Sequence, residues 1–383
     1  MPVYLDHNAT TPIDKDVLDA MMPFLQDYHG NPASVHGYGR KARTALDQAR
    51  EQVAALVRVH PSQVIFTSGG TESNNLAIKG MMNANKNRAI AISEIEHSSL
   101  IAPAQAMQKH DWELDLIKAD HLGQVLPSAV EDVIRDETCL VSVMMANNET
   151  GVIQDIAAIS DMARAHDIIV HSDAVQAAGK IEIDFESTGA HMISLSAHKL
   201  YGPKGAGALI VDKSLELEPL IHGIGHEMGM RGGTENVAGI VGFGKAAELA
   251  VKNLDARTSH LLELRHALEN GLHGLEDVTI IAEHTKRLPN TISLLVPGIE
   301  GETLLMNLDR AGIAVSSGSA CASGSINPSH VLLAMGIDRE SARCAIRVSL
   351  GKDNTFADVD IFLTGLQQEL TNIQTLELRA WAS

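Results

Sequence analysis

The sequence predicts an α/β protein with a mainly parallel β-sheet and helices on both of its faces. Short apolar runs alternate with longer segments of helical periodicity through the first half of the chain, which is typical of parallel strands joined by crossover helices. The chain has 383 residues, enough for two domains with sizeable cores. Its 45% hydrophobic and 20% charged residues are those of an ordinary globular protein.

The expected elements follow one another in a regular order. Apolar runs predict strands at residues 64–66, 90–93, 114–117, 140–146, 168–171, 192–195 and 206–211. Amphipathic spacing predicts helices at residues 42–56, 76–82, 98–109, 127–135 and 155–166. A helix from about residue 256 to 273 leads into strands at 279–281, 291–296 and 313–316 and a closing helix at 361–378. We therefore expect a large domain at residues 14–255 and a smaller α+β domain made of residues 1–13 and 256–383.

Net charge and cysteine content exclude several classes of partner and site. The formal charge of −18 repels nucleic acid backbones and anionic membranes, so neither is an expected partner. No run of 18 apolar residues occurs and the amino terminus lacks an apolar signal core, so we expect a cytoplasmic protein. Cys139, Cys321 and Cys344 contain no CxxC pair, which argues against a disulfide framework and a cysteine-built metal site.

A glycine turn follows the first of these strands. Residues 67–75, TSGGTESNN, link strand 64–66 to a helix. The amides of a first helical turn and the positive end of the helix dipole favour a phosphate, and Gly69 and Gly70 let the backbone approach such a group closely. A plain helix cap by Ser68 or Thr71 explains the same residues equally well.

Polar residues stand at the carboxyl ends of the later strands, the edge where ligands bind in an open parallel sheet. They are Glu96, His97, Asn147, Asn148, Glu149, Asp173 and Gln176, and we expect them to converge with Thr71 and Lys199. Asn148 precedes Gly151 and can shape a turn instead. Asp173 can pair with a lysine, hold a protonated ring nitrogen of a cofactor, or cap a helix at residues 174–178.

Lys199 stands at the most unusual of these positions. Strand 192–195 delivers Ser196, His198 and Lys199 to its carboxyl end, and the glycines and proline at 202–207 forbid a helix there. A lysine among apolar neighbours can be driven toward the free amine, which forms Schiff bases with carbonyl compounds. Ser196 and His198 can hold a phosphate oxygen. A solvated loop lysine is the plainer alternative.

Cys321 lies at the centre of residues 316–325, SSGSACASGS. This segment has nothing to bury, so we expect a mobile loop with an exposed thiol, either a nucleophile or an inert linker thiol. Cys139, in the apolar run CLVSVMM, is expected in the core, whereas the sequence leaves the role of Cys344 open. Arg347 is expected on a strand, where its guanidinium suits a carboxylate ligand.

Nine segments, in their order along the chain, resemble the NifS/IscS-type cysteine desulfurases, which are pyridoxal phosphate (PLP) enzymes of the class-V aminotransferase family and of fold type I. The segments are YLDHNATTP, NPASVHG, FTSGGTES, EHSS, ANNETG, HSDAVQ, SAHKLYGPKG, RGGTEN and SSGSACASG. The resemblance runs nearly from end to end. It implies a seven-stranded, mainly parallel sheet between helices in the large domain, a smaller α+β domain, and a homodimer.

The resemblance also implies how the cofactor is held. Lys199 would carry PLP on its side-chain amine, and His97 would stack on the pyridine ring. Asp173 would pair with the protonated ring nitrogen, and Gln176 would contact the phenolic oxygen. The groups implied for the phosphate are Gly70, Thr71, Ser196, His198 and, from the neighbouring subunit, Thr234.

The implied substrate is L-cysteine, which becomes L-alanine. Asn148 and Arg347 would clamp its carboxylate, Lys199 and His97 would carry protons, and Cys321 would accept the sulfur as a persulfide. A sulfur-acceptor protein, such as an iron–sulfur cluster scaffold, would then receive it. No metal is implied beyond a transient contact of Cys321 with a cluster.

Three departures from the family pattern leave the acceptor, and a nitrogenase-specific or housekeeping role, open. Ala197 stands where the family commonly has glycine, and Lys352 where it often has arginine. The tail LELRAWAS lacks the motif by which some family members bind a scaffold protein. One rival function is a selenocysteine lyase or another small-amino-acid PLP enzyme in which Cys321 is incidental. The other is a non-catalytic PLP-binding regulator.

Overall fold

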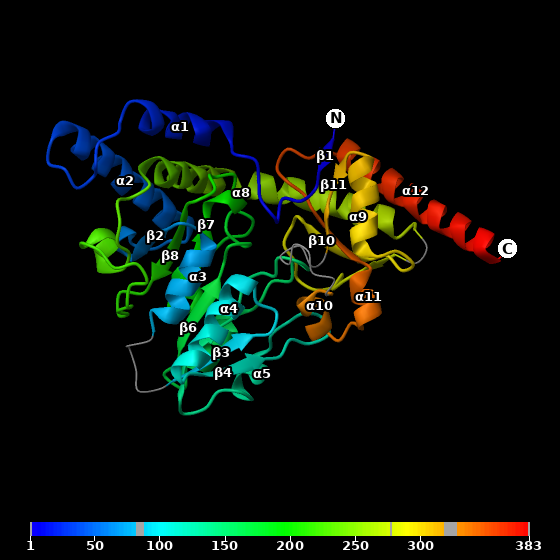
Figure 1. Ribbon diagram of the computed structural model, residues 1–383, viewed down its shortest axis with the longest axis horizontal. Helices are drawn as coiled ribbons and strands as arrows, with labels where there is room; N and C mark the ends of the chain where they lie inside the picture. Colours follow the sequence, from blue (N-terminus) through cyan, green and yellow to red (C-terminus); the bar gives the residue numbers. More distant parts are fainter. Residues whose placement is uncertain (1, 82–87, 276–277, 318–327, 382–383) are drawn as a thin grey trace.

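The computed structural model describes residues 2–81, 88–275, 278–317 and 328–381, and a seven-stranded sheet forms its centre (Figure 1). In spatial order the strands are β2 (Val64–Thr67), β8 (Gly207–Val211), β7 (Met192–Ser196), β6 (Ile169–Asp173), β5 (Thr138–Ser142), β3 (Ala89–Ser93) and β4 (Glu113–Ile117). From β7 to β4 all pairs are parallel, whereas β8 runs antiparallel to both β7 and β2. The expected mainly parallel sheet is confirmed. Its antiparallel strand β8 lies between β2 and β7, and it reverses direction because a turn without a crossover helix joins β7 to β8.

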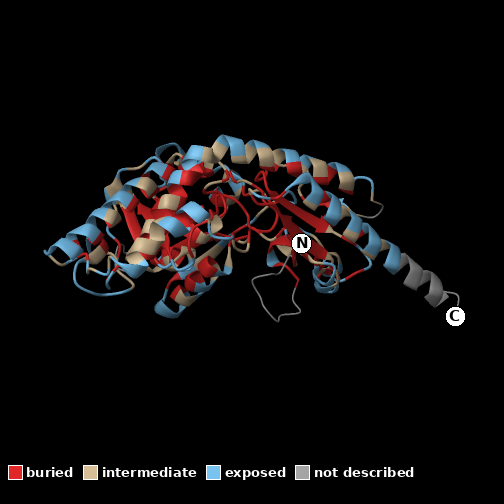
Figure 2. Cartoon of the chain, turned by 90° about the horizontal axis from the view of Figure 1, so that it is seen from above, coloured by how far each residue is buried: buried red, intermediate tan, exposed pale blue. Residues whose placement is uncertain are grey.

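Helices cover both faces of this sheet, and the sheet between them is buried (Figure 2). One face carries α1 (Lys15–Gln26), α2 (Gly37–Leu56), α5 (Pro127–Glu131), α6 (Ile156–Arg164), α7 (Phe185–Thr188) and the first part of α8 (Val237–Leu272). The other face carries α3 (Gly70–Lys79) and α4 (Ser98–Met107). Successive side chains of β2 enter opposite cores: Val64 and Phe66 face the first, and Ile65 the second.

A further core brings the two ends of the chain together, and it includes Val3, Leu264 and Phe362. Its strands are β1 (Val3–Tyr4) paired with β11 (Ile313–Ala314), and the antiparallel sheet of β12 (Ser316–Ser317), β13 (Ala345–Ser349), β10 (Thr291–Leu295) and β9 (Thr279–Ile280). Its helices are α9 (Gly301–Arg310), α12 (Phe356–Trp381) and the second part of α8. The short helices α10 (His330–Ala334) and α11 (Arg339–Arg343) instead pack into the first core through Val331, Leu332 and Ala342. The division into domains at residues 14–255 and 256–383 stays a prediction.

Several elements differ from their expected bounds. Helix α8 begins well before residue 256 and runs unbroken through two cores. Its glycines serve close packing, since a Cβ on Gly242 would lie 2.5 Å from the sulfur of Met21. Residues 316–317, expected to open a mobile loop, form β12 because they pair with β13. Within the described residues, none of the helices has both the length and the apolar character to cross a bilayer.

Candidate active site

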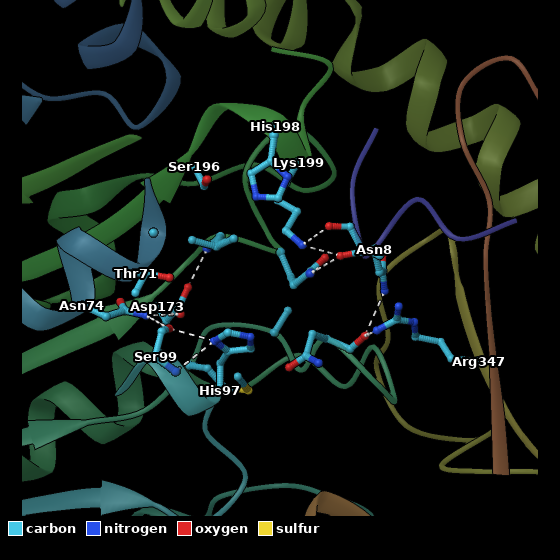
Figure 3. A pocket seen from close by; sticks show the side chains of 17 residues that line it. Asn8, Thr71, Asn74, His97, Ser99, Asp173, Ser196, His198, Lys199 and Arg347 are labelled. Carbon is cyan, nitrogen blue, oxygen red and sulfur yellow. Dashed lines mark hydrogen bonds between the residues drawn. The ribbon is translucent and has the colours of Figure 1, made fainter. Parts of the chain in front are cut away.

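A cavity of about 310 Å³ opens at the carboxyl edge of the large sheet (Figure 3), and this volume suits a small ligand. Ten residues singled out in the sequence line it: Gly70, Thr71, His97, Asn148, Asp173, Gln176, Ser196, His198, Lys199 and Arg347. The others are Asn8, Ala9, Asn74, Ser99, Met144, Ala146 and Val175. Thr234 is exposed on the loop before α8 and does not line the cavity, and Cys321 lies outside the described residues.

One end of the cavity is the amino terminus of α3. Gly69 is the N-cap residue of this helix, with φ of +153°, and no side chain caps it. The cap by Ser68 or Thr71 considered from the sequence is therefore wrong. A Cβ on Gly70 would lie 2.8 Å from a methyl group of Val175, so the backbone there approaches its neighbours as closely as glycine allows. The helix terminus, with its uncapped amides and positive dipole, suits a phosphate.

Asp173 ends β6 with its carboxylate almost fully buried. Its Oδ2 accepts a hydrogen bond of 2.7 Å from Asn74, and its Oδ1 accepts one of 2.9 Å from the backbone amide of Val175. Residues 175–177 form a turn and Ala178 a β-bridge with Ile181, so the helix cap considered from the sequence is wrong. Asn74 also donates to the hydroxyl of Ser99 at 2.9 Å, which ties the carboxylate to α4 (Figure 3). Asp173 is thus held rigidly on the cavity wall.

His97 caps the amino terminus of α4 and faces the cavity beside Asp173. Its Nδ1 accepts from the backbone amide of Ser99 at 3.1 Å. Burial lowers the pKa of His97; Asp173 raises it, but Lys199 and His330 lower it further. The net shift favours the neutral imidazole. It carries its hydrogen on Nε2, because Nδ1 accepts from Ser99, and it can lie flat against an aromatic ring and donate that hydrogen.

Ser196 ends β7, His198 lies in the turn that follows it, and both line the cavity. Burial lowers the pKa of His198 to about 4, and Lys199 and Lys204 add to this shift. Its Nδ1 is 3.1 Å from the hydroxyl of Thr10. A neutral imidazole held in this way can donate a hydrogen bond from Nε2 to an anion.

Lys199 leaves β7 in a single 3₁₀ turn and extends across the cavity (Figure 3). Its Nζ donates to the backbone oxygens of Asn8 at 2.5 Å and Ala9 at 2.7 Å. Asn8 in turn donates to the backbone oxygen of Asn148 at 3.2 Å. The amino-terminal segment, whose polar groups the sequence left unassigned, is therefore a wall of the site.

Arg347 lies at the opposite end of the cavity from Thr71, on β13 (Figure 3). It donates to the backbone oxygen of Asn148 at 2.9 Å and to the carboxylate of Asp6 at 2.7 Å. Its side chain is 3% exposed, and its Nε has no hydrogen-bond partner in the described part of the chain. An orphaned buried N–H on a guanidinium favours an anionic ligand such as a carboxylate.

Three polar residues expected at this edge are buried behind the cavity. Oε1 of Glu96 accepts from the amide of Met144 at 2.6 Å, and burial raises the pKa of Glu96 to about 8. Glu149 bonds the hydroxyl of Ser329, and burial raises its pKa to about 7. Asn147 donates to the backbone oxygen of Ile95 at 3.1 Å. These side chains hold the strand ends together rather than meeting a ligand.

The described cysteines lie away from the cavity. Cys139 is buried in the core as expected, and burial raises the pKa of its thiol to about 11. Cys344 is half-buried at the end of α11. In the described ranges, no three His, Cys, Asp or Glu side chains are grouped so that they could hold a metal ion.

Comparison with known proteins gives consistent matches over nearly the whole chain. The family described as Aminotransferase class-V matches residues 3–362. Cysteine desulfurase IscS of Dictyoglomus turgidum is 43% identical over 377 residues, which cover 98% of this chain and 96% of that protein. Cysteine desulfurase IscS 1 of Archaeoglobus fulgidus is 42% identical, with 97% and 98% covered. A solved NifS-like protein superposes with a TM-score of 0.91 at 39% identity, over 97% of this chain and 100% of that chain.

The chemistry of the lining residues fits PLP. The uncapped terminus of α3 suits the phosphate, and Lys199 offers an amine for an aldehyde. Asp173 offers a fixed carboxylate for a protonated ring nitrogen. Arg347, at the other end, leaves room and a donor for a substrate carboxylate.

Proposed function

The chain belongs to the class-V aminotransferase family and is a PLP-dependent cysteine desulfurase, and we propose that Lys199 carries the cofactor and that Cys321 accepts the sulfur. The observation that supports the first assignment is the meeting of three groups in one cavity. They are the amine of Lys199, the fixed carboxylate of Asp173 and the uncapped amino terminus of α3. An amine, an acid and a phosphate cradle are the groups that this cofactor requires.

The cofactor is held at both ends in this proposal. Gly70, Thr71, Ser196 and His198 would bind its phosphate, and Asp173 would share a proton with its ring nitrogen. His97 would lie against the ring, and Gln176 would contact the phenolic oxygen. When bound, PLP supplies an electron sink for bonds broken at the substrate's α-carbon.

The chain's own residues bind the substrate and move its protons. Arg347 and Asn148 bind the carboxylate of L-cysteine, which orients the α-carbon toward the Lys199 amine. The amine of Lys199 accepts and returns a proton, and the Nε2–H of the neutral His97 imidazole donates one and takes it back. The Cys321 thiolate bonds to the substrate sulfur as the carbon–sulfur bond breaks, so cysteine and the Cys321 thiol become alanine and a Cys321 persulfide.

Three further features belong to the proposal. A sulfur-acceptor protein, such as an iron–sulfur scaffold, takes the persulfide sulfur. A homodimer brings Thr234 of one copy to the phosphate in the other, and the exposure of Thr234 away from its own cavity supports this. The cytoplasmic location expected from the sequence stays a prediction.

The test is incubation of the PLP-loaded protein with L-cysteine, with alanine measured and the mass of the Cys321 peptide determined. We expect alanine and one added sulfur on Cys321. The variant Cys321→Ser should keep the coloured cofactor but lose the added sulfur and sulfide release, whereas Cys344→Ser should retain both. Sulfide release by Cys321→Ser at the wild-type rate would refute the role of Cys321 and favour a lyase in which that thiol is incidental.

A further inference from the structure

A second lysine, Lys180, is buried beside the site and has no part in the mechanism above. Its side chain is 7% exposed, although lysine is among the residues least often buried. Its Nζ donates to the side-chain oxygen of Gln176 at 2.8 Å and to that of Asn8 at 2.9 Å. Gln176 and Asn8 both line the cavity. Lys180 therefore contacts the site through two of its wall residues.

The fold places Lys180 there through a tight turn after β6. Gly179 has φ of +74°, and a Cβ on it would lie 3.1 Å from Cβ of Leu200. The backbone oxygen of Lys180 accepts a hydrogen bond of 3.1 Å from Thr258 on α8. The turn thus reverses the chain and returns Lys180 over Gln176, where α8 holds it.

The hydrogen bonds of Gln176 leave one orientation for its amide. A lysine nitrogen donates toward this oxygen, so Gln176 must present its Oε1 to Lys180. Its Nε2 then lies on the other side, and one of its two hydrogens goes to the backbone oxygen of Asn8 at 2.9 Å. The second hydrogen is left for a ligand in the cavity. Without Lys180, only the hydrogen bond to the backbone oxygen of Asn8 would hold this orientation, and Asn8 would itself lose its contact with Lys180.

We propose that Lys180 is a positioning residue of this active site: by donating to Gln176 and Asn8, it fixes the Gln176 amide with an N–H directed at the phenolic oxygen of PLP. This inference rests on the proposed function and extends it to a residue that does not touch the ligand. Its consequence is a fixed hydrogen-bond donor at the oxygen next to the Lys199 linkage.

The charged groups around Lys180 do not disturb this role. Burial lowers the pKa of Lys180 well below its usual value, and Lys199 and Arg347 lower it further. His7 faces the same region; burial lowers its pKa to about 4, and Lys180 adds to the shift, so His7 brings no charge at neutral pH. Lys180 donates two N–H groups whether it is an ammonium or a neutral amine, and both states hold Gln176 in the same orientation.

The test is the pH titration of the visible absorption band of bound PLP. A hydrogen bond donated to the phenolic oxygen stabilises its negative charge and so weakens its attraction for the proton that titrates. Loss of that hydrogen bond therefore raises the midpoint pH of the titration. We expect Lys180→Met to raise it by about one pH unit, from the usual strength of one hydrogen bond. Gln176→Ala should give a similar shift, and the double variant should shift no further than Gln176→Ala alone.

Controls separate this role from charge and from folding. Lys352→Met removes a partly buried lysine outside the cavity and should leave the midpoint unchanged. Lys180→Gln restores an N–H donor and should return the midpoint toward the wild-type value. If Lys180→Met does not fold, Lys180→Ala, which leaves space for water, takes its place.

Two results would overturn the inference. One is an unchanged midpoint in the Lys180 variant. The other is that Lys180→Met raises the midpoint by as much in the Gln176→Ala protein as in the wild type. Wild-type protein that forms no coloured band with PLP would refute the proposed function itself, a distinct outcome.

Discussion

The substitution Arg347→Lys tests the substrate end of the site most sharply. Two nitrogens of the guanidinium are already used, one on the backbone oxygen of Asn148 and one on Asp6, and Nε remains without a partner. Lysine keeps the positive charge but has a single nitrogen, which cannot hold Asp6, Asn148 and a substrate carboxylate in one planar fork. The variant therefore loses at least one charge-assisted hydrogen bond to the substrate.

The size of the loss follows from the strength of such bonds. A hydrogen bond to a charged group contributes about 1.5 to 3 kcal/mol, and each 1.36 kcal/mol changes a rate constant about tenfold. We expect kcat/KM for L-cysteine to fall by roughly 10- to 150-fold, mostly through KM. In the proposed arrangement the cofactor would lie at the other end of the cavity, so its binding should not change.

The assay is alanine formation against cysteine concentration, with PLP content read from its visible absorption. The matched control is Arg287→Lys, which disturbs another buried arginine, paired with Glu269 at 2.5 Å and away from the cavity. It should lower stability and leave KM unchanged. A KM for Arg347→Lys within about twofold of wild type, at full PLP content, would show that Arg347 does not bind the carboxylate.

Three further substitutions test the cofactor end and the buried acid behind it. Asp173→Asn should retain PLP yet lower alanine formation about 100-fold or more, because the ring nitrogen loses its anionic partner; a loss under tenfold would count against that pairing. Gly70→Ala should weaken PLP binding about tenfold, since its Cβ would lie 2.8 Å from Val175. Gly37→Ala on α2 should not, since its Cβ would meet only the Arg40 side chain, at 3.9 Å. Burial raises the pKa of Glu96 to about 8, above its value of about 4.3 in an unfolded chain. Glu96 therefore lowers the free energy of unfolding progressively as pH rises between these values. The free energy of unfolding in urea should rise for Glu96→Gln relative to wild type by on the order of 1 kcal/mol per pH unit in that window. A difference that does not change with pH would contradict the raised pKa of Glu96.

Much of the sheet and the site edge could be predicted from local patterns. Strand–helix alternation predicts parallel strands, and parallel strands place their carboxyl ends at one edge. Asp173 ends β6, and His97 and Lys199 lie in the short segments just after β3 and β7, so their meeting in one cavity follows from the topology.

What the sequence did not predict depends on contacts between distant segments. Asn8 reaches the cavity because β1 pairs with β11 and the backbone amide of Asn8 donates to the hydroxyl of Ser349. Neither contact can be read from the sequence around Asn8. Lys180 is buried only because the turn at Gly179 returns it over Gln176. Strand β12 has only two residues, too few to show a period.

The most direct test of the account is chemical identification of the lysine that carries PLP. The loaded protein is reduced with borohydride, which fixes the cofactor to its lysine, and the modified peptide is then identified by mass spectrometry. The account predicts the cofactor on Lys199 alone. Modification of Lys180, the other lysine buried at this site, or of no lysine at all would contradict it.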